Sequence, residues 1–242
     1  MTFYRYALLS CAVAAILTGK AYADDFKVYS PRVEKGEFAA EANLNYSFDH
    51  REEQDGYFSQ VVGGEYGVND WWQTELAGEF EKENGDNNKL NNIKWENIIA
   101  PWKPGENFVD AGFYAELEKS THSEDPNNFE AKLLLEKNID RFVNTANLKL
   151  EHEFGNNAED KWGSGLAWRT KYRYAESFEP GFEYHADFGR FDDGQSFNDQ
   201  EHLLGPVAEG KFGKVKYDAG VLFGVSDSAP DTTVKLNLEY EF

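Results

Sequence analysis

Sulfur is nearly missing from this sequence. Among 242 residues there is one methionine and one cysteine, Cys11. A lone cysteine cannot close a disulfide within the chain, and it cannot supply a paired-cysteine metal site. Both kinds of cross-link are therefore excluded as the basis of the fold.

Long apolar runs are also missing. The one run, from Ala7 to Leu17, is shorter than the roughly 20 apolar residues that a membrane-spanning helix needs. It follows Arg5 and precedes Ala21-Tyr22-Ala23, and this order is typical of a secretory signal peptide with a small-x-small cleavage site. We predict a signal peptide over residues 1–23 in preference to an uncleaved anchor, so that export leaves a chain without cysteine.

Basic residues are scarce. The chain has 24 Lys and Arg against 44 Asp and Glu, a formal net charge of −20. Nucleic-acid binding needs many basic side chains on phosphates, so a nucleic-acid partner is excluded. Strongly acidic chains are often disordered, but such chains are poor in aromatic residues. Here aromatic residues make up 16% of the sequence, which predicts a folded protein.

Alternating apolar and polar residues recur from residue 36 to the end. Between Phe38 and Phe48, every even-numbered residue is apolar or aromatic. No stretch in this part keeps a helical period, and side chains that alternate in this way lie on opposite faces of a strand. Most segments are about ten to thirteen residues long, which suits a tilted crossing of a bilayer. We predict twelve strands, at residues 36–49, 56–68, 71–82, 90–100, 107–119, 128–137, 142–154, 162–174, 181–191, 201–212, 214–225 and 232–242.

The connections between these segments are short and long in turn. Residues 69–70, 138–141 and 213 are short connections, whereas 50–55 and 192–200 are longer and strongly polar. Such alternation is typical of a meandering transmembrane barrel, with short turns on the periplasmic side and longer loops outside.

The sequence therefore predicts an all-β fold, a single transmembrane antiparallel up-and-down β-barrel over residues 36–242. Residues 24–35 would be a periplasmic N-terminal lead-in or a partial plug. Ten strands is the competing count, because Gly205-Pro206 interrupts one segment and proline is poorly tolerated inside a paired strand.

A soluble barrel or sandwich also alternates, so the environment of the apolar face needs its own argument. Small residues on this face, such as Ala40 and Gly64, would fill a barrel interior poorly but need no packing partner against lipid. Aromatic residues such as Trp71 and Tyr172 gather near strand ends, as they do at the two interfaces of a membrane. Both features predict that the apolar face meets lipid.

The last strand supplies a family resemblance. Val234, Leu236, Leu238, Tyr240 and Phe242 share one face and end the chain on an aromatic residue. With the signal peptide and the serial strands, this ending resembles the β-barrel proteins of the Gram-negative outer membrane. The resemblance implies a place in the cell outer membrane, contact with its lipid, and assembly by the barrel-assembly machinery. It also implies that Tyr240 and Phe242 are read as the assembly signal, with the other three residues completing the strand.

The polar phase of the strands predicts a charged lumen. On this phase carboxylates outnumber basic side chains by more than two to one. A confined wall of one charge sign concentrates counter-ions, so we predict a passive, porin-like channel for small hydrophilic solutes or ions that prefers cations. The predicted lumen-lining residues are Glu75, Glu116, Glu151, Arg169, Lys171, Arg173, Glu183 and Asp187.

Three of these residues form a basic ladder along one strand. A basic ladder is either a track for anionic solutes or part of an internal neutralisation, and carboxylates on the next strand favour neutralisation. A common register across the intervening turn would set Arg173 opposite Glu183, Lys171 opposite His185, and Arg169 opposite Asp187.

Other classes of function have weaker support. A closed structural or surface-binding barrel, whose function would lie in its loops, is the main alternative. An outer-membrane enzyme ranks third, since the His-x-Ser-Asn type signature of outer-membrane lipases does not follow His152, His185 or His202. No histidine or carboxylate spacing matches a zinc or calcium site, and no motif indicates a cofactor. The solute, the gating and the oligomeric state stay open.

Overall fold

The structure is a computed structural model that describes residues 26–52, 54–82 and 88–242. The predicted signal peptide, residues 1–23, lies outside the described residues. Within the described part of the chain, no helix is long and apolar enough to cross a membrane.

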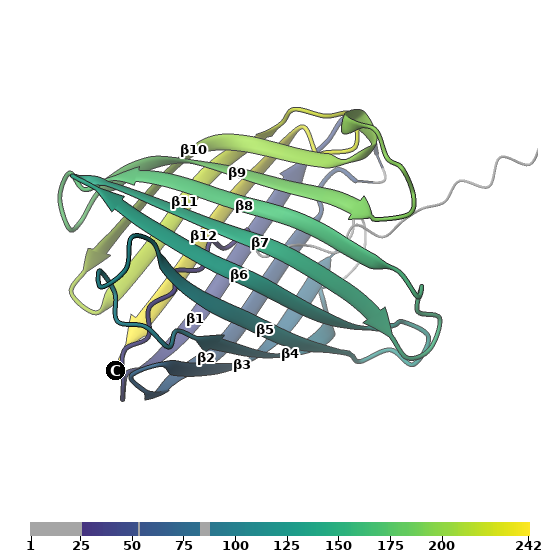
Figure 1. The fold of residues 1–242 in the computed structure, drawn as a ribbon. Helices are drawn as coiled ribbons and strands as arrows, with labels where there is room; N and C mark the ends of the chain where they lie inside the picture. Colours follow the sequence, from purple (N-terminus) through teal and green to yellow (C-terminus); the bar gives the residue numbers. More distant parts are fainter. Residues whose placement is uncertain (1–25, 53, 83–87) are drawn as a thin grey trace, which may run out of the picture.

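Twelve antiparallel strands form one closed barrel, in which each strand pairs with its neighbours in sequence and β1 pairs with β12 (Figure 1). This confirms the predicted fold and strand count. A 3-10 turn, η1 (Phe197–Asp199), lies in the loop before β10. The strands are β1 (Phe38–Phe48), β2 (Phe58–Asn69), β3 (Trp72–Lys82), β4 (Lys89–Ile99), β5 (Asp110–Ser120), β6 (Asn127–Ile139), β7 (Phe142–Phe154), β8 (Trp162–Tyr172), β9 (Glu179–Arg190), β10 (Glu201–Phe212), β11 (Val215–Gly224) and β12 (Thr232–Glu241).

The barrel closes where its first and last strands meet. Leu44 of β1 lies opposite Leu236 of β12, and the Phe242 N–H donates to the Phe38 carbonyl at 3.0 Å. The rings of Phe38 and Phe242 are 5.2 Å apart. We call this end of the barrel, with the C-terminus and the tight hairpins, the turn end, and the opposite end the loop end (Figure 1).

Proline does not interrupt β10. Pro206 lies opposite Phe182 of β9, while toward β11 the pairing passes from Leu204 to Val207. Proline has no N–H to donate, so the described ladder omits Gly205 and Pro206 on that one side. The strand continues past the gap, and the ten-strand alternative is thereby wrong.

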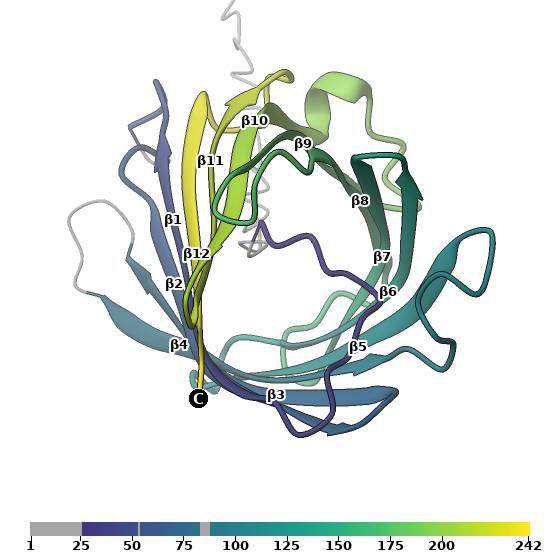
Figure 2. The ribbon, with the colours of Figure 1, turned by 90° about the vertical axis from the view of Figure 1, so that its left-hand side faces the viewer.

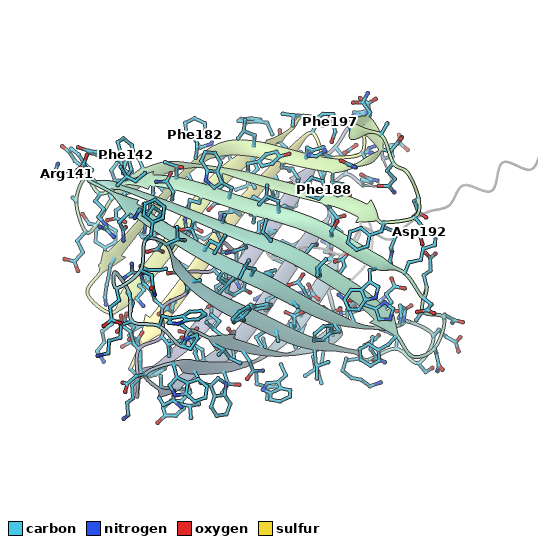
Figure 3. All side chains as sticks on the ribbon, viewed as in Figure 1. Arg141, Phe142, Phe182, Phe188, Asp192 and Phe197 are labelled. Atoms are coloured by element: carbon cyan, nitrogen blue, oxygen red, sulfur yellow. The ribbon has the colours of Figure 1, made fainter. Side chains whose placement is uncertain are left out.

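The two faces of the barrel differ in polarity. On β7, Leu148 is 47% exposed on the outside whereas Asn147 beside it is 1% exposed on the inside. Outward aromatic side chains such as Phe142 and Phe182 project from the surface (Figure 3). A continuous apolar exterior of this extent is suited to lipid and not to water.

An arginine joins two loops at the loop end of the closing seam. Arg51 bonds to Asp49 and donates to the carbonyls of Ser228 and Ala229, at 3.2 and 3.0 Å. These hydrogen bonds from Arg51 hold the pKa of the Asp49 carboxyl below its ordinary value. The β1–β2 loop and the β11–β12 loop are therefore tied where the barrel closes.

The N-terminal segment lies inside the barrel. Residues 26–33, which we call the strap, run across the ring of strands when the barrel is viewed from its turn end (Figure 2). Lys27 bonds to Glu41 of β1, and Tyr29 bonds to Asn147 of β7. Residues 26–33 of the predicted N-terminal lead-in therefore contact both sides of the lumen, and residues 24 and 25 lie outside the described residues.

The two faces lead to a test of strand phase. Leu148 lies at the middle of β7, where a lysine on the lipid face costs about 2–4 kcal/mol. We expect Leu148→Lys to reduce the yield of folded barrel, measured as the heat-modifiable band on a gel. The control is Asn237→Lys, an inward position of β12 that is 8% exposed. Equal loss in both variants would contradict the assignment of faces.

Candidate functional site: the barrel lumen

Buried charges are unevenly distributed around the inner wall. Among the described residues, β1–β6 carry ten buried carboxylates and two buried lysines, whereas β7–β12 carry three buried carboxylates against two lysines and an arginine. The acidic excess of the lumen therefore lies on one half. The ten are Glu41, Glu65, Glu75, Glu79, Glu96, Asp110, Glu116, Glu118, Glu130 and Glu136.

Six glutamates form a row across six neighbouring strands, from β2 to β7. Each lies directly opposite the next in the hydrogen-bonded register, and all are buried on the inner face. Side chains directly opposite on one face have Cβ atoms about 4.5–5.5 Å apart, and like charges in such pairs are destabilising. The members of this glutamate row are, in order, Glu65, Glu75, Glu96, Glu116, Glu130 and Glu151.

The row runs along the lumen as well as around it. Glu65 lies near Asn69, where β2 reaches the turn end, and Glu151 lies near Phe154, where β7 reaches the loop end. Strands of a closed barrel are tilted, so a row perpendicular to them advances along the barrel axis. The six carboxylates therefore extend from the turn-end part of the wall to its loop-end part.

Polar partners accompany the row. The Tyr114 hydroxyl donates to Glu116 at 2.7 Å, and the Tyr29 hydroxyl of the strap donates to Glu96 at 3.0 Å. Near the loop end, Lys132 lies 2.8 Å from Glu130 and Lys149 lies 3.1 Å from Glu151. These lysines offset part of the acidic charge of the row.

The opposite half of the wall contains a balanced ionic cluster. The Lys235 ammonium lies 2.6 Å from Glu183 and 2.8 Å from Asp218. Arg169 lies 3.6 Å from Glu183 and also pairs with Glu209. Each buried charge has an opposite partner here, as a low-dielectric interior requires.

The basic ladder is paired, but not as the sequence predicted. Arg169 lies opposite Glu183 and Lys171 lies opposite Gly181, so the predicted partners are wrong by four positions. The reason is the turn, which is closed by a bridge between Ala175 and Phe178 and leaves only two residues at its tip. As a result β9 begins at Glu179, two residues earlier than predicted.

Arg173 and Asp187 leave the predicted ladder altogether. Arg173 is exposed beyond the end of β8 and donates to Asn138 at 2.9 Å. Asp187 pairs with Lys149 at 3.0 Å, which brings it beside Glu151.

The other predicted lumen residues lie on the inner face. Glu75, Glu116 and Glu151 belong to the glutamate row, and Arg169, Glu183 and the half-buried Lys171 belong to the balanced cluster. The predicted terminal residues Val234, Leu236, Leu238, Tyr240 and Phe242 lie on the outer face of the last strand or at its end.

Sequence reasoning missed the row as a row, and it missed the strap's contacts. One signal for the row was present in the sequence, because Glu65 and Glu75 are equidistant from Asp70 in the turn between them. The same holds for Glu130 and Glu151 about the turn at residues 140 and 141. The contacts of Lys27, Tyr29 and Arg32 have no comparable signal.

Comparisons with known proteins place the fold. No family model and no curated protein matches the chain. The crystal structure of the COG4313 outer membrane channel from Pseudomonas putida F1 is similar, with a TM-score of 0.62 at 10% identity over 87% of this chain and 97% of that one. The KdgM porin gives 0.54 at 12% identity over 84% and 99% of the two chains. The Acinetobacter baumannii outer membrane protein Omp33 gives 0.50 at 12% identity, over 86% and 99%.

At these identities the likeness concerns the fold. The chain forms a closed antiparallel sheet with an apolar exterior, and this barrel has the fold of outer-membrane channels and porins. This confirms the resemblance that the last strand indicated.

The balanced cluster leads to a stability prediction. Removing one partner of a buried ion pair leaves a charge uncompensated and costs about 3–5 kcal/mol. We expect Lys235→Met to lower the free energy of unfolding by about this amount, since the Lys235 and Glu183 side chains are both 0% exposed. The loss would be seen as a lower urea midpoint of unfolding in lipid vesicles. The matched control is Lys161→Met, whose partner Asp193 lies in a loop and whose side chain is 39% exposed. An unchanged midpoint for Lys235→Met would contradict the buried pairing.

Proposed function

We propose that the protein is a passive outer-membrane channel for small hydrophilic solutes or ions, and that its lumen prefers cations. The glutamate row carries this proposal. Six directly opposed like charges weaken a sheet, so a purely structural barrel gains nothing from placing them in register. A negative wall along a confined passage raises the local concentration of cations.

The similar solved structures support the same role. Two of them are described as a channel and a porin, and the similarity covers 97% and 99% of their chains. The likeness is to transport proteins, which supports a channel over an enzyme. No cofactor is proposed.

A closed barrel is the second candidate. The observation that favours it is the strap, which lies across the lumen together with the balanced cluster on one wall. In that case the function would lie in the polar loops at the loop end.

The terminal strand fits assembly by the barrel-assembly machinery. Tyr240 and Phe242 are 44% and 69% exposed at the turn end, beside the seam at which β12 pairs with β1. We propose that they, with Val234, Leu236 and Leu238, are the residues that the machinery reads.

The channel proposal is tested by electrical recording. We expect the refolded protein to give stable conductance steps in a planar bilayer, with a reversal potential in a salt gradient that shows cation preference. Glu116→Gln with Glu130→Gln replaces two neighbouring carboxyl groups of the row, which lie opposite each other on β5 and β6. We expect this double variant to lower the cation-to-anion permeability ratio by about twofold or more.

The control is Glu118→Gln, on the same strand but outside the row, where the carboxylate lies 3.7 Å from Lys94. A larger effect in this control than in the double variant would remove the row from the explanation. Conductance steps without any ion preference would contradict the proposed cation preference and would leave the channel function standing.

A further inference from the structure

The strap joins opposite sides of the barrel. Lys27 bonds to Glu41 on β1, and two residues later Tyr29 bonds to Asn147 on β7. In the closed ring of twelve strands, β1 and β7 are six strands apart, so they face each other across the lumen. A barrel of about eight strands is filled by its own side chains, whereas twelve leave space that this segment enters.

Tyr29 anchors the middle of the strap. Its N–H donates to the Asn147 side chain at 2.7 Å, and the Asn147 amide donates back to the Tyr29 carbonyl at 2.8 Å. The Tyr29 ring lies 4.5 Å from the Tyr114 ring and packs with Ile98 and Leu134. One side chain of the wall therefore supplies both backbone hydrogen bonds that a neighbouring strand would otherwise give.

The strap matches the charge of each half of the wall. On the acidic half, Arg32 donates to Glu136 at 2.6 Å, and Ser30 donates to the same carboxylate at 2.8 Å. On the opposite half, the strap presents carbonyls instead of charges. Arg169 donates to the Val28 carbonyl at 3.3 Å, and Lys235 donates to the Phe26 carbonyl at 2.8 Å.

Lys27 places an ammonium beside the start of the glutamate row. Glu41, Glu65 and Glu75 each offer a carboxylate oxygen within 4.8 Å of the others, and Lys27 bonds to the first of them. The Tyr29 hydroxyl bonds to Glu96, the next member of the row. The strap thus contacts the turn-end half of the row with a positive charge and a donor.

We propose that the strap is a releasable plug in the cation pathway. It lies over the turn-end half of the glutamate row, where its Lys27 ammonium takes the position of a permeating cation, and its departure raises conductance. The inference rests on the proposed function, because it concerns the regulation of that pathway. The strap is outside every named strand, so its release breaks side-chain bonds and leaves the barrel's ladder intact.

The test weakens the strap's anchors in the full chain and records single channels. Asn147→Ala removes both hydrogen bonds to the Tyr29 backbone, and we expect the ratio of open to closed time to rise about tenfold, as for one to two hydrogen bonds lost. Asn237→Ala is the matched control, another buried inward asparagine, whose side chain has no hydrogen-bond partner among the described residues.

A second variant avoids dependence on one substitution. Replacing residues 26–33 with a glycine-serine segment of the same length removes the side-chain contacts of the strap. We expect its ratio of open to closed time to be at least as high as in Asn147→Ala. The heat-modifiable band verifies that each variant is a folded barrel.

The outcomes separate the two proposals. A parent that conducts steadily, with no rise in either strap variant, overturns the plug and leaves the channel standing. Folded protein that stays silent both with and without the strap overturns the channel itself, and the plug with it. An equal rise in Asn237→Ala would assign the effect to lumen volume and overturn the plug.

Discussion

A chain that crosses hydrocarbon has no water to satisfy its backbone, so every N–H and C=O group in the membrane needs a partner within the protein. A closed sheet meets this requirement only if its first strand pairs with its last. Here β1 and β12 pair over ten residues, from Ala39–Glu241 to Phe48–Thr232. Closure also separates the two faces completely, because each strand then turns alternate residues to lipid and to the lumen. The apolar exterior and the charged interior both follow from that one condition.

The interior then has to accommodate charges that the exterior cannot accept. On the half formed by β7–β12, buried acids and bases are equal in number and pair closely, as in the group around Lys235 and Glu183. On the half formed by β1–β6 they are unequal, and five of its ten buried carboxylates lie in register as part of the glutamate row. The first half resembles an ordinary protein interior in its balance of charge. The second half departs from that balance, and it is the departure that needs a functional explanation.

The strand pattern was predictable because the period of two is local to each segment. Twelve segments and their phase follow from alternation alone. Pro206 interrupts the pairing of β10 with β11 but not its pairing with β9. The register between neighbouring strands is harder to predict from the sequence, since it depends on how many residues each turn contains. The tight turn at Asp140, with a φ of 52°, makes the pairing of Glu130 with Glu151 readable from the sequence. The turn between β8 and β9 has only two residues at its tip, and the partners of Arg169 and Lys171 therefore lie four positions from the predicted ones.

The strap was beyond sequence analysis because most of its contacts, unlike that of Lys27 with Glu41, are with residues roughly 70 to 210 positions away, brought together only when the barrel closes. Its position nevertheless follows from the same charge argument as the rest of the lumen. An acidic wall needs positive charge near it, and the protein supplies that charge in two forms. Lys94, Lys132 and Lys149 are built into strands and stay with the wall, whereas Lys27 and Arg32 arrive on a segment that no ladder holds. Charges of the first kind set the field that a solute meets. Charges of the second kind occupy the same carboxylates that a solute cation would approach, so in this barrel closing the pathway and neutralising its wall are one interaction.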